Sequence, residues 1–266
     1  MSDVCLADDM VDVRWIWLFL HHEVGEDGYR SARADAAWAF WAQQTGQQPS
    51  PARGTKGEFT TLVPAEGDGW IKLQRTGSGD GIHLDLVVED VDAAAEEAVG
   101  LGATLVDRYA RVRVLRSPGG FVFCFTDWDA EGRPSLQLRT GDELVDQACL
   151  DIPAPRYADE IAFWSTLTGW EAVQSTRAEF RALRRPESLP VRVLLQRLED
   201  AAVDEPVTGH VDVACDDRAA ATPRWEDAGA DVVAQEAFWT VLRDPAGVPF
   251  CLTDRDPQTG LLPGPG

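Results

Sequence analysis

The stretch "LRSPGGFVFCFTD" at residues 115–127 decides the fold, because a close copy of it, "LRDPAGVPFCLTD", occupies residues 242–254. Both copies belong to a longer repeat, in which 81–129 aligns with 208–256 at a constant offset and without a gap. Unrelated segments rarely share so long an ungapped match. The chain is therefore a tandem duplication of one unit.

Length and composition fit two domains. The chain has 266 residues, which suits two domains of about 130 residues that can each bury a core. We expect their bounds at 13–135 and 143–257.

There is no helix-length apolar run and the first residues are acidic, so we expect no membrane span, no signal peptide and a cytoplasmic location. Five cysteines without a CxxC pair indicate free thiols.

The charge of the chain limits its partners. A formal net charge of -21 argues against nucleic acid, because phosphate binding needs a basic surface. The same charge favours a ligand that is cationic, or at least not anionic.

Each repeat has the pattern strand, helix, strands, twice over. In the first repeat, hydrophobic periodicity predicts one helix over 32–46, ended by Gly46, and a second helix that Asp90 begins and Gly102 ends. Runs rich in β-branched and aromatic residues predict strands at 13–21, 57–64, 69–75, 82–88, 104–110, 112–117 and 121–127. We predict an α+β fold of two tandem domains, each with two strand–helix–three-strand modules in a curved mixed sheet and with helices on the convex face.

Two-residue alternation assigns the faces of the last strands. Leu84, Leu86, Phe123 and Phe125 are expected beneath helices. The opposite side is predicted to face a ligand. It carries a histidine, an aspartate and a cysteine from each repeat: His83, Asp85, Cys124, His210, Asp212 and Cys251.

The order of these motifs resembles the glyoxalase/bleomycin-resistance/dioxygenase superfamily, also called vicinal oxygen chelate proteins. The shared features are an "AFWxxxTG" helix (39–46 and 162–169), a histidine that opens the fifth strand, "GA" after the second helix and a "DPxG" turn (244–247) before the last strand. The resemblance covers nearly the whole chain as two domains.

Such a family usually chelates a divalent metal with side chains from the first, fourth, fifth and eighth strands. His83 and His210 match the fifth-strand ligand, whereas Cys124 and Cys251 stand where relatives keep a glutamate. The remaining positions offer poor donors, namely Arg14, Trp15, Lys72, Gln74, Leu144, Val145 and Gln196. One matching ligand per domain does not hold a metal, so we expect no metal and no cofactor.

Other interpretations of these residues stay open. A Cys–His pair could bind zinc with the help of Asp85 or Asp212, and Cys124 with His83 could form a nucleophile pair. The triplet at 21–23, "HHE", looks like a metal motif, but adjacent residues of a strand point to opposite faces. We interpret it as a strand end that leads into an acidic loop.

Aromatic and amide side chains complete the predicted ligand-binding set. Tryptophans on predicted strands are candidates for stacking on a flat ligand: Trp15, Trp17, Trp70 and Trp239. Gln74 and Gln196 occupy the fourth strand of the two copies.

The resemblance and the missing ligands together predict a metal-free protein that binds a small molecule, aromatic or cationic, and sequesters it as drug-resistance members of this superfamily do. The alternative is a metal-dependent lyase, isomerase or dioxygenase with degenerate ligands, because a fold alone does not fix an activity. We expect the fused domains to form an intramolecular pseudo-dimer, as a monomer or a homodimer.

Overall fold

The computed structural model describes residues 10–24, 31–77, 79–128, 134–136, 142–202 and 204–262. Within these ranges, no helix is long and apolar enough to cross a membrane. The predicted boundary between the repeats, at 136–144, falls mostly on residues outside those described, so the domain bounds stay a prediction.

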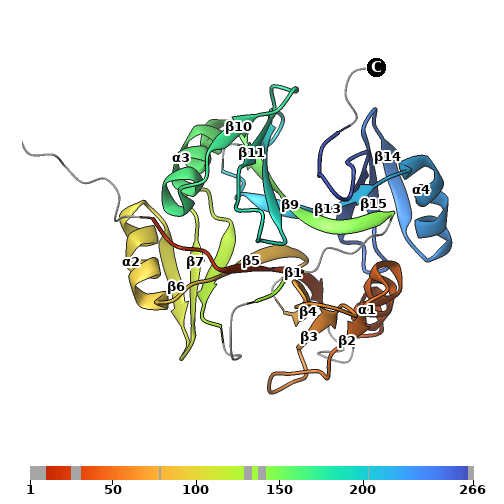
Figure 1. Cartoon of the computed structure of the whole chain (residues 1–266), viewed down its shortest axis with the longest axis horizontal. Coiled ribbons are helices and arrows are strands. Elements are labelled where there is room, and N and C mark those ends of the chain that lie inside the picture. The colour runs from red at the N-terminus through yellow and green to blue at the C-terminus, as the bar shows by residue number, and fades with distance from the viewer. Residues whose placement is uncertain are drawn as a thin grey trace, which may run out of the picture. The chain divides into compact units, whose positions relative to one another are not determined.

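The first repeat consists of two strand–helix–three-strand modules, as predicted (Figure 1). Its elements are β1 (Trp15–Glu23), α1 (Ala32–Thr45), β2 (Gln48–Pro49), β3 (Phe59–Val63), β4 (Ile71–Thr76), β5 (Gly81–Val87), α2 (Val91–Gly100), β6 (Thr104–Arg108), β7 (Val112–Arg116) and β8 (Val122–Thr126). The strands form one mixed sheet in the order β2-β3-β4-β1-β5-β8-β7-β6. In it, β1 runs parallel to β4, and β5 runs parallel to β8.

The second repeat has the same order of elements. They are β9 (Glu143–Pro153), η2 (Ala154–Arg156), α3 (Tyr157–Thr168), β10 (Ala172–Gln174), β11 (Phe180–Leu183), β12 (Arg192–Leu198), β13 (Thr208–Cys215), α4 (Arg218–Asp227), β14 (Asp231–Gln235), β15 (Trp239–Arg243) and β16 (Pro249–Thr253). Their sheet order is β10-β11-β12-β9-β13-β16-β15-β14. The predicted α+β class and the tandem architecture are confirmed.

Local sequence signals set most of these boundaries. The Asp90 side chain accepts hydrogen bonds from the amides of Asp92 and Ala93 and so begins α2, which ends just before Gly102 at φ 104°. The triplet "HHE" forms the end of β1, as interpreted from the sequence, although the strand continues to Glu23, two residues beyond the predicted end at 21. The two-residue strand β2 is too short for an alternation to reveal it.

The compact units of the structure are not the same as the two sequence repeats. The structure divides into two compact units, and each takes one module from each repeat. The first unit joins the β5–β8 module with the β9–β12 module, and the second joins the β1–β4 module with the β13–β16 module. The units do not coincide with the sequence repeats, because α1 and α3 each pack on the last strand of the other repeat.

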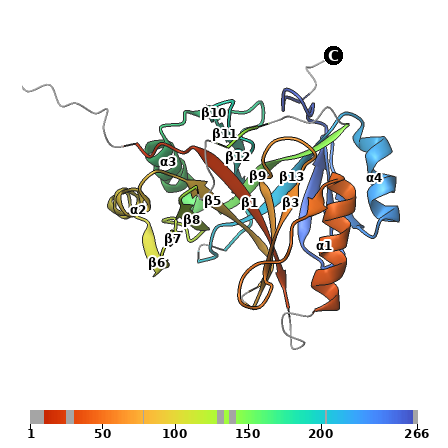
Figure 2. The same ribbon diagram turned by 60° about the horizontal axis from the view of Figure 1, so that its bottom comes forward.

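An aromatic cluster forms the core of the second unit. Trp41 of α1 packs on Phe250 of β16 with ring centroids 5.1 Å apart, and on Trp225 of α4 at 5.9 Å. Phe40 contacts the same two residues. The helices α1 and α4 accordingly lie side by side (Figure 2). Edge-to-face geometry dominates these contacts and adds to the gain from burial.

The first unit repeats the arrangement with α3. Trp164 packs on Phe123 of β8 at 5.0 Å, and Phe163 on the same ring at 5.9 Å. The prediction that Phe123 lies beneath a helix is therefore correct. The covering helix belongs to the other repeat, which alternation within one strand could not reveal.

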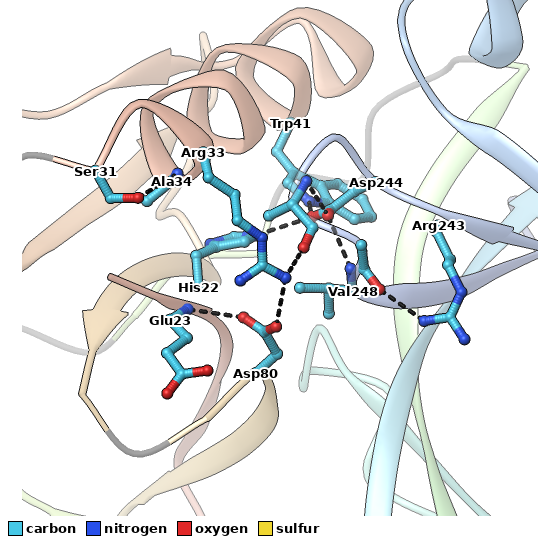
Figure 3. A network of polar contacts seen from close by, with 12 residues as sticks. His22, Glu23, Ser31, Arg33, Ala34, Trp41, Asp80, Arg243, Asp244 and Val248 are labelled. Carbon is cyan, nitrogen blue, oxygen red and sulfur yellow. Dashed lines mark hydrogen bonds and ion pairs between the residues drawn. The ribbon is translucent and has the colours of Figure 1, made fainter. Parts of the chain in front are cut away.

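A buried carboxylate bonds to the tryptophan of α1 in the second unit (Figure 3). Asp244, in the turn between β15 and β16, accepts the indole N–H of Trp41 at 2.9 Å and the amide N–H of Ala246 at 2.8 Å. Nε2 of the fully buried His22 lies 2.9 Å from the same carboxylate. Burial acts to raise the pKa of Asp244, but the hydrogen bonds from His22, Trp41 and Val248 together lower it.

Arg33 of α1 also reaches this turn. Its guanidinium donates to the carbonyl of Ala246 and lies 2.7 Å from the carboxylate of Asp80, which in turn accepts the amide N–H of Glu23 (Figure 3). This network could not be predicted from the sequence, because partners such as His22 and Asp244 lie 222 positions apart.

In the first unit the carboxylate comes from the helix instead. Glu160 of α3 accepts the indole N–H of Trp164 at 2.8 Å and the amide N–H of Gly119 at 2.5 Å. Burial raises the pKa of Glu160, against the hydrogen bonds of Ser117, Gly119 and Trp164. A Cβ atom on Gly119 would lie 2.7 Å from Oε1 of Glu160 and 2.4 Å from Cγ2 of Val207, so only glycine fits there.

Alignment of the two repeats shows that the buried carboxylate has changed place between the helix and the turn. Glu160 corresponds to Ala37 of α1, and Ser117 corresponds to Asp244. Where the turn supplies the carboxylate, the helix carries alanine, and Ala37 packs with Ala246 in the core. In both units, one buried carboxylate accepts the N–H of one indole and at least one amide N–H of the turn.

We expect Glu160→Ala to lower the free energy of unfolding by about 2–4 kcal/mol, because the indole of Trp164 and the amide of Gly119 lose their acceptor. Adding Ser117→Asp to this variant should restore part of the loss, since it places the carboxylate where Asp244 stands in the other unit. Urea unfolding followed by circular dichroism measures both effects.

Ser117→Asp alone is the control. With Glu160 still present it should destabilise the protein, because it buries a second carboxylate beside the first. If Ser117→Asp had the same effect in both backgrounds, the two positions would not share one acceptor role.

Candidate functional site

The first candidate cluster lies on β5 and β8 and consists of His83, Asp85 and Cys124. The parallel register sets Asp85 beside Cys124, and His83 precedes Asp85 by two positions on the same side of β5. One donor atom from each residue lies within 4.8 Å of the others. The side chains are buried, at 7%, 7% and 6% exposed. The structure therefore brings together the three residues that alternation had assigned to one face.

Polar contacts within the first cluster are incomplete. Nε2 of His83 lies 3.0 Å from Oδ1 of Asp85, but the pair is not aligned for a hydrogen bond, and this buried oxygen accepts none within the described ranges. Burial raises the pKa of the Cys124 thiol well above its usual range, and the nearby Asp85 carboxylate raises it further. A thiol in this environment is protonated at neutral pH.

The second cluster is the counterpart on β13 and β16 and consists of His210, Asp212 and Cys251. The register pairs Asp212 with Cys251, and one donor atom from each residue again lies within 4.8 Å of the others. Nε2 of His210 lies 3.4 Å from Oδ1 of Asp212. The amide of Gln147 on β9 donates to Oδ2 of Asp212 at 2.6 Å, so this carboxylate has partners on both oxygens.

A buried arginine distinguishes the second cluster from the first. Arg255 forms a bidentate ion pair with Asp146 at 2.7 and 3.2 Å. Burial acts to raise the pKa of Asp212, but the hydrogen bond from His210, the charges of His210 and Arg255, and the hydrogen bond from Gln147 together lower it. The sequence did not indicate Gln147, Asp146 or Arg255, since none of them belongs to a recognisable motif.

The two clusters differ in how well they fit a metal ion. Imidazole, carboxylate and thiol are donors that zinc accepts, and three of them with an open position resemble a catalytic site. In the first cluster, Asp85 keeps an oxygen without a hydrogen bond, which fits a ligand role. In the second, both oxygens of Asp212 face donors, and the Arg255 charge acts on the same carboxylate. The first cluster fits a metal and the second does not.

A separate candidate surface lies on β1, β3 and β4, and we call it the aromatic–lysine face. Most of its members alternate with buried residues, and cross-strand pairs such as Phe19–Lys72 and Phe59–Gln74 align them. The face consists of Trp17, Phe19, His21, Phe59, Thr61, Lys72 and Gln74. All are half-buried except Phe19, which is 5% exposed.

Ring contacts organise this face around one cation. Nζ of Lys72 lies 3.2 Å from the ring centre of Trp17 and 5.1 Å from that of Phe19, and Phe19 meets Phe59 edge to face at 6.4 Å. Oε1 of Gln74 is buried and accepts no hydrogen bond from any residue that the structure describes. Trp17 and Gln74 were predicted from the sequence as ligand residues. Phe19, His21 and Phe59 were missed, although their alternation with buried leucines was visible.

Two of the predicted ligand residues are core residues instead. Trp15 and Trp70 are each only 1% exposed. Trp15 packs on Trp128 at 6.4 Å, and the indole of Trp70 donates to the carbonyl of Val145 at 2.8 Å. A stacking role does not fit such burial. Gln196 on β12 and Trp239 on β15 are half-buried.

Comparisons with known proteins agree with this architecture. The family model described as "Glyoxalase-like domain" matches residues 27–126 and 147–253. A search of curated proteins gives no significant match.

Solved structures share the fold at low sequence identity. A Mn(II)-bound glyoxalase from Novosphingobium aromaticivorans superposes with a TM-score of 0.64 at 18% identity, covering 96% of this chain and 89% of its own. The 2,2',3-trihydroxybiphenyl 1,2-dioxygenase of Sphingomonas wittichii strain RW1 gives 0.58 at 13% identity, covering 91% and 90%. A 2,3-dioxygenase from Pseudomonas sp. KL28 gives 0.58 at 13%, covering 96% of both chains.

The lowered pKa of Asp212 predicts a pH-dependent contribution to stability. A carboxylate whose pKa is lower in the folded than in the unfolded state stabilises fully above the unfolded value, near pH 4, and this stability is lost as the pH falls through the folded value. The difference in free energy of unfolding between the wild type and Asp212→Asn should therefore shrink between about pH 5 and pH 2. Denaturant titrations at several pH values measure it.

The exposed neighbour Asp216 supplies the control, because Asp216→Asn should change stability little at any pH. A difference for Asp212→Asn that stays constant down to pH 2 would contradict the assigned role of the His210 and Gln147 contacts.

Proposed function

Because this chain belongs to the glyoxalase-like domain family, we propose that it binds a small molecule on the aromatic–lysine face of its first repeat and needs no resident metal to do so. The observation that carries the proposal is the composition of that face. Half-buried rings surround a few polar atoms, and the amide oxygen of Gln74 is buried without a partner among the described residues. Ligand sites have this mixture of apolar surface and sparse, directed polar groups.

The repeated His–Asp–Cys trio supports binding without a metal. It occurs in both repeats, and in the second it is an internal polar cluster with Gln147 and Arg255 beside it. The trio of the first repeat occupies the matching positions of β5 and β8.

A metal-dependent lyase, isomerase or dioxygenase is the second candidate, favoured by the first cluster alone. His83, Asp85 and Cys124 would hold the ion, and the oxygen of Asp85 without a hydrogen bond supports this role. A bound divalent ion would supply a Lewis acid that polarises a substrate oxygen. His83 would then have to be neutral, and Cys124 would have to lose its proton to the solvent.

We further propose a cytoplasmic location and a sequestering role for the binding. Buried free thiols at Cys124, Cys149, Cys215 and Cys251 support a reducing compartment. Sequestration needs affinity only, and so accords with a site that has no resident metal.

Elemental analysis of the purified protein tests the choice. We expect no stoichiometric divalent metal, and therefore a melting temperature that does not change when a chelator is added. Asp85→Asn is the informative variant. One metal per chain in the wild type, lost in Asp85→Asn together with a chelator-sensitive melt, would establish the second candidate.

A further inference from the structure

A charged residue in the second repeat replaces an aromatic residue of the first, close to the His–Asp–Cys clusters. Arg255 lies two residues after the end of β16 and is only 6% exposed. Its counterpart at the constant offset of the repeat is Trp128, whose ring packs on that of Trp15. The second repeat therefore has a guanidinium at a position where the first repeat has an uncharged indole.

Two buried carboxylates share the charge of Arg255. Asp146 and Asp212 lie on the neighbouring strands β9 and β13 and are 3% and 4% exposed. The guanidinium binds Asp146 through two nitrogens, and its Nε donates to the hydroxyl of Thr253 at 3.2 Å. Burial acts to lower the pKa of Arg255, but the charge and hydrogen bond of Asp146 and the charge of Asp212 together raise it. Both carboxylates thus act on the same cation.

The donor atoms of the second cluster are of the kinds that a divalent ion accepts. One atom each of His210, Asp212 and Cys251 lies within 4.8 Å of the other two, and imidazole, carboxylate and thiolate all ligate zinc. The amide of Gln147 donates to Asp212, which is the kind of outer contact that orients a ligating carboxylate. What opposes a divalent ion here is the positive charge of Arg255, because a guanidinium stays protonated at neutral pH.

A cation that belongs to the chain competes better than a dissolved one. The guanidinium is held beside Asp146 by its own backbone, which gives it a high effective concentration at that carboxylate. A metal ion would have to displace it and would leave a buried charge without its partner, which is costly.

We infer that Arg255 is the built-in cation of the second cluster, and that its guanidinium, rather than a lack of donor atoms, keeps divalent metal ions out of the second repeat. The inference goes beyond the proposed function. It concerns the repeat that contributes nothing to the aromatic–lysine face, and it holds for either candidate function.

Metal titrations of the full chain test the inference. Every protein in the test, including the parent, carries Asp85→Asn, which removes a donor of the first cluster so that only the second is observed. Arg255→Met takes away the guanidinium and keeps an apolar stem. We expect it to bind one Co²⁺ per chain at least about tenfold more tightly than the parent, as measured by calorimetry. The absorption spectrum of the bound Co²⁺ should include a thiolate-to-metal band from Cys251.

Three variants control the result. Arg218→Met breaks a comparable bidentate pair, with Asp254 at 2.9 and 3.0 Å, and should gain no Co²⁺ site. Arg255→Lys keeps a positive charge and should bind no Co²⁺. His210→Ala, added to Arg255→Met, should abolish the new site. Without metal, Arg255→Met should melt at a lower temperature than the parent, and Co²⁺ should restore part of the difference.

The possible outcomes separate a built-in cation from a merely structural arginine. If the folded Arg255→Met variant bound Co²⁺ no better than the parent or Arg218→Met, the inference would be wrong. It would also be wrong if Arg255→Met stayed unfolded both with and without Co²⁺, because the ion is expected to take over the charge of the guanidinium. Neither result would bear on the proposed binding at the aromatic–lysine face, which belongs to the first repeat.

Discussion

The hydrogen bond between a buried carboxylate and a tryptophan indole determines the positions of α1 and α3, the two helices that pack on the last strand of the other repeat. Trp41 reaches Asp244 and Trp164 reaches Glu160, and in both cases the same carboxylate also accepts an amide N–H of the turn before the last strand. An indole N–H buried without an acceptor costs free energy, so each helix has one favourable position over its strand. The rings around Phe123 and Phe250 pack once that position is set. Both sheets therefore depend on contacts made between the repeats.

The sequence predicted the elements well because their signals are local. Duplication, capping by Asp90, termination at Gly102 and the alternation of β5 and β8 each depend on a few neighbouring residues. The grouping of modules into compact units could not be predicted in this way, because Phe123 has the same pattern whether α2 or α3 covers it. Pairing of distant modules is a tertiary property that periodicity does not encode.

In the candidate sites, too, the features set by local sequence patterns could be predicted, and those set by contacts between distant elements could not. Alternation was enough to bring His83, Asp85 and Cys124 together, since a parallel register between β5 and β8 determines their approach. Whether the aspartate of a trio keeps a carboxylate oxygen without a hydrogen bond depends on Gln147 and Arg255. These residues come from other parts of the chain and belong to no recognisable motif. For the tryptophans, phase alone could not separate the half-buried Trp17 from the buried Trp15, because both have the same parity on β1.

The exchange of the carboxylate between helix and turn gives the duplicated chain a way to avoid mispairing. If α3 docked on the turn of its own repeat, Glu160 would meet Asp244, and two carboxylates would be buried together. If α1 docked on the turn that holds Ser117, neither side would supply a carboxylate, and the indole of Trp41 would lose its charged acceptor. Only the observed partners are complementary. Two copies of one gene segment that once carried identical surfaces have thus become orthogonal, and a newly made chain can sort four similar modules into the correct pairs.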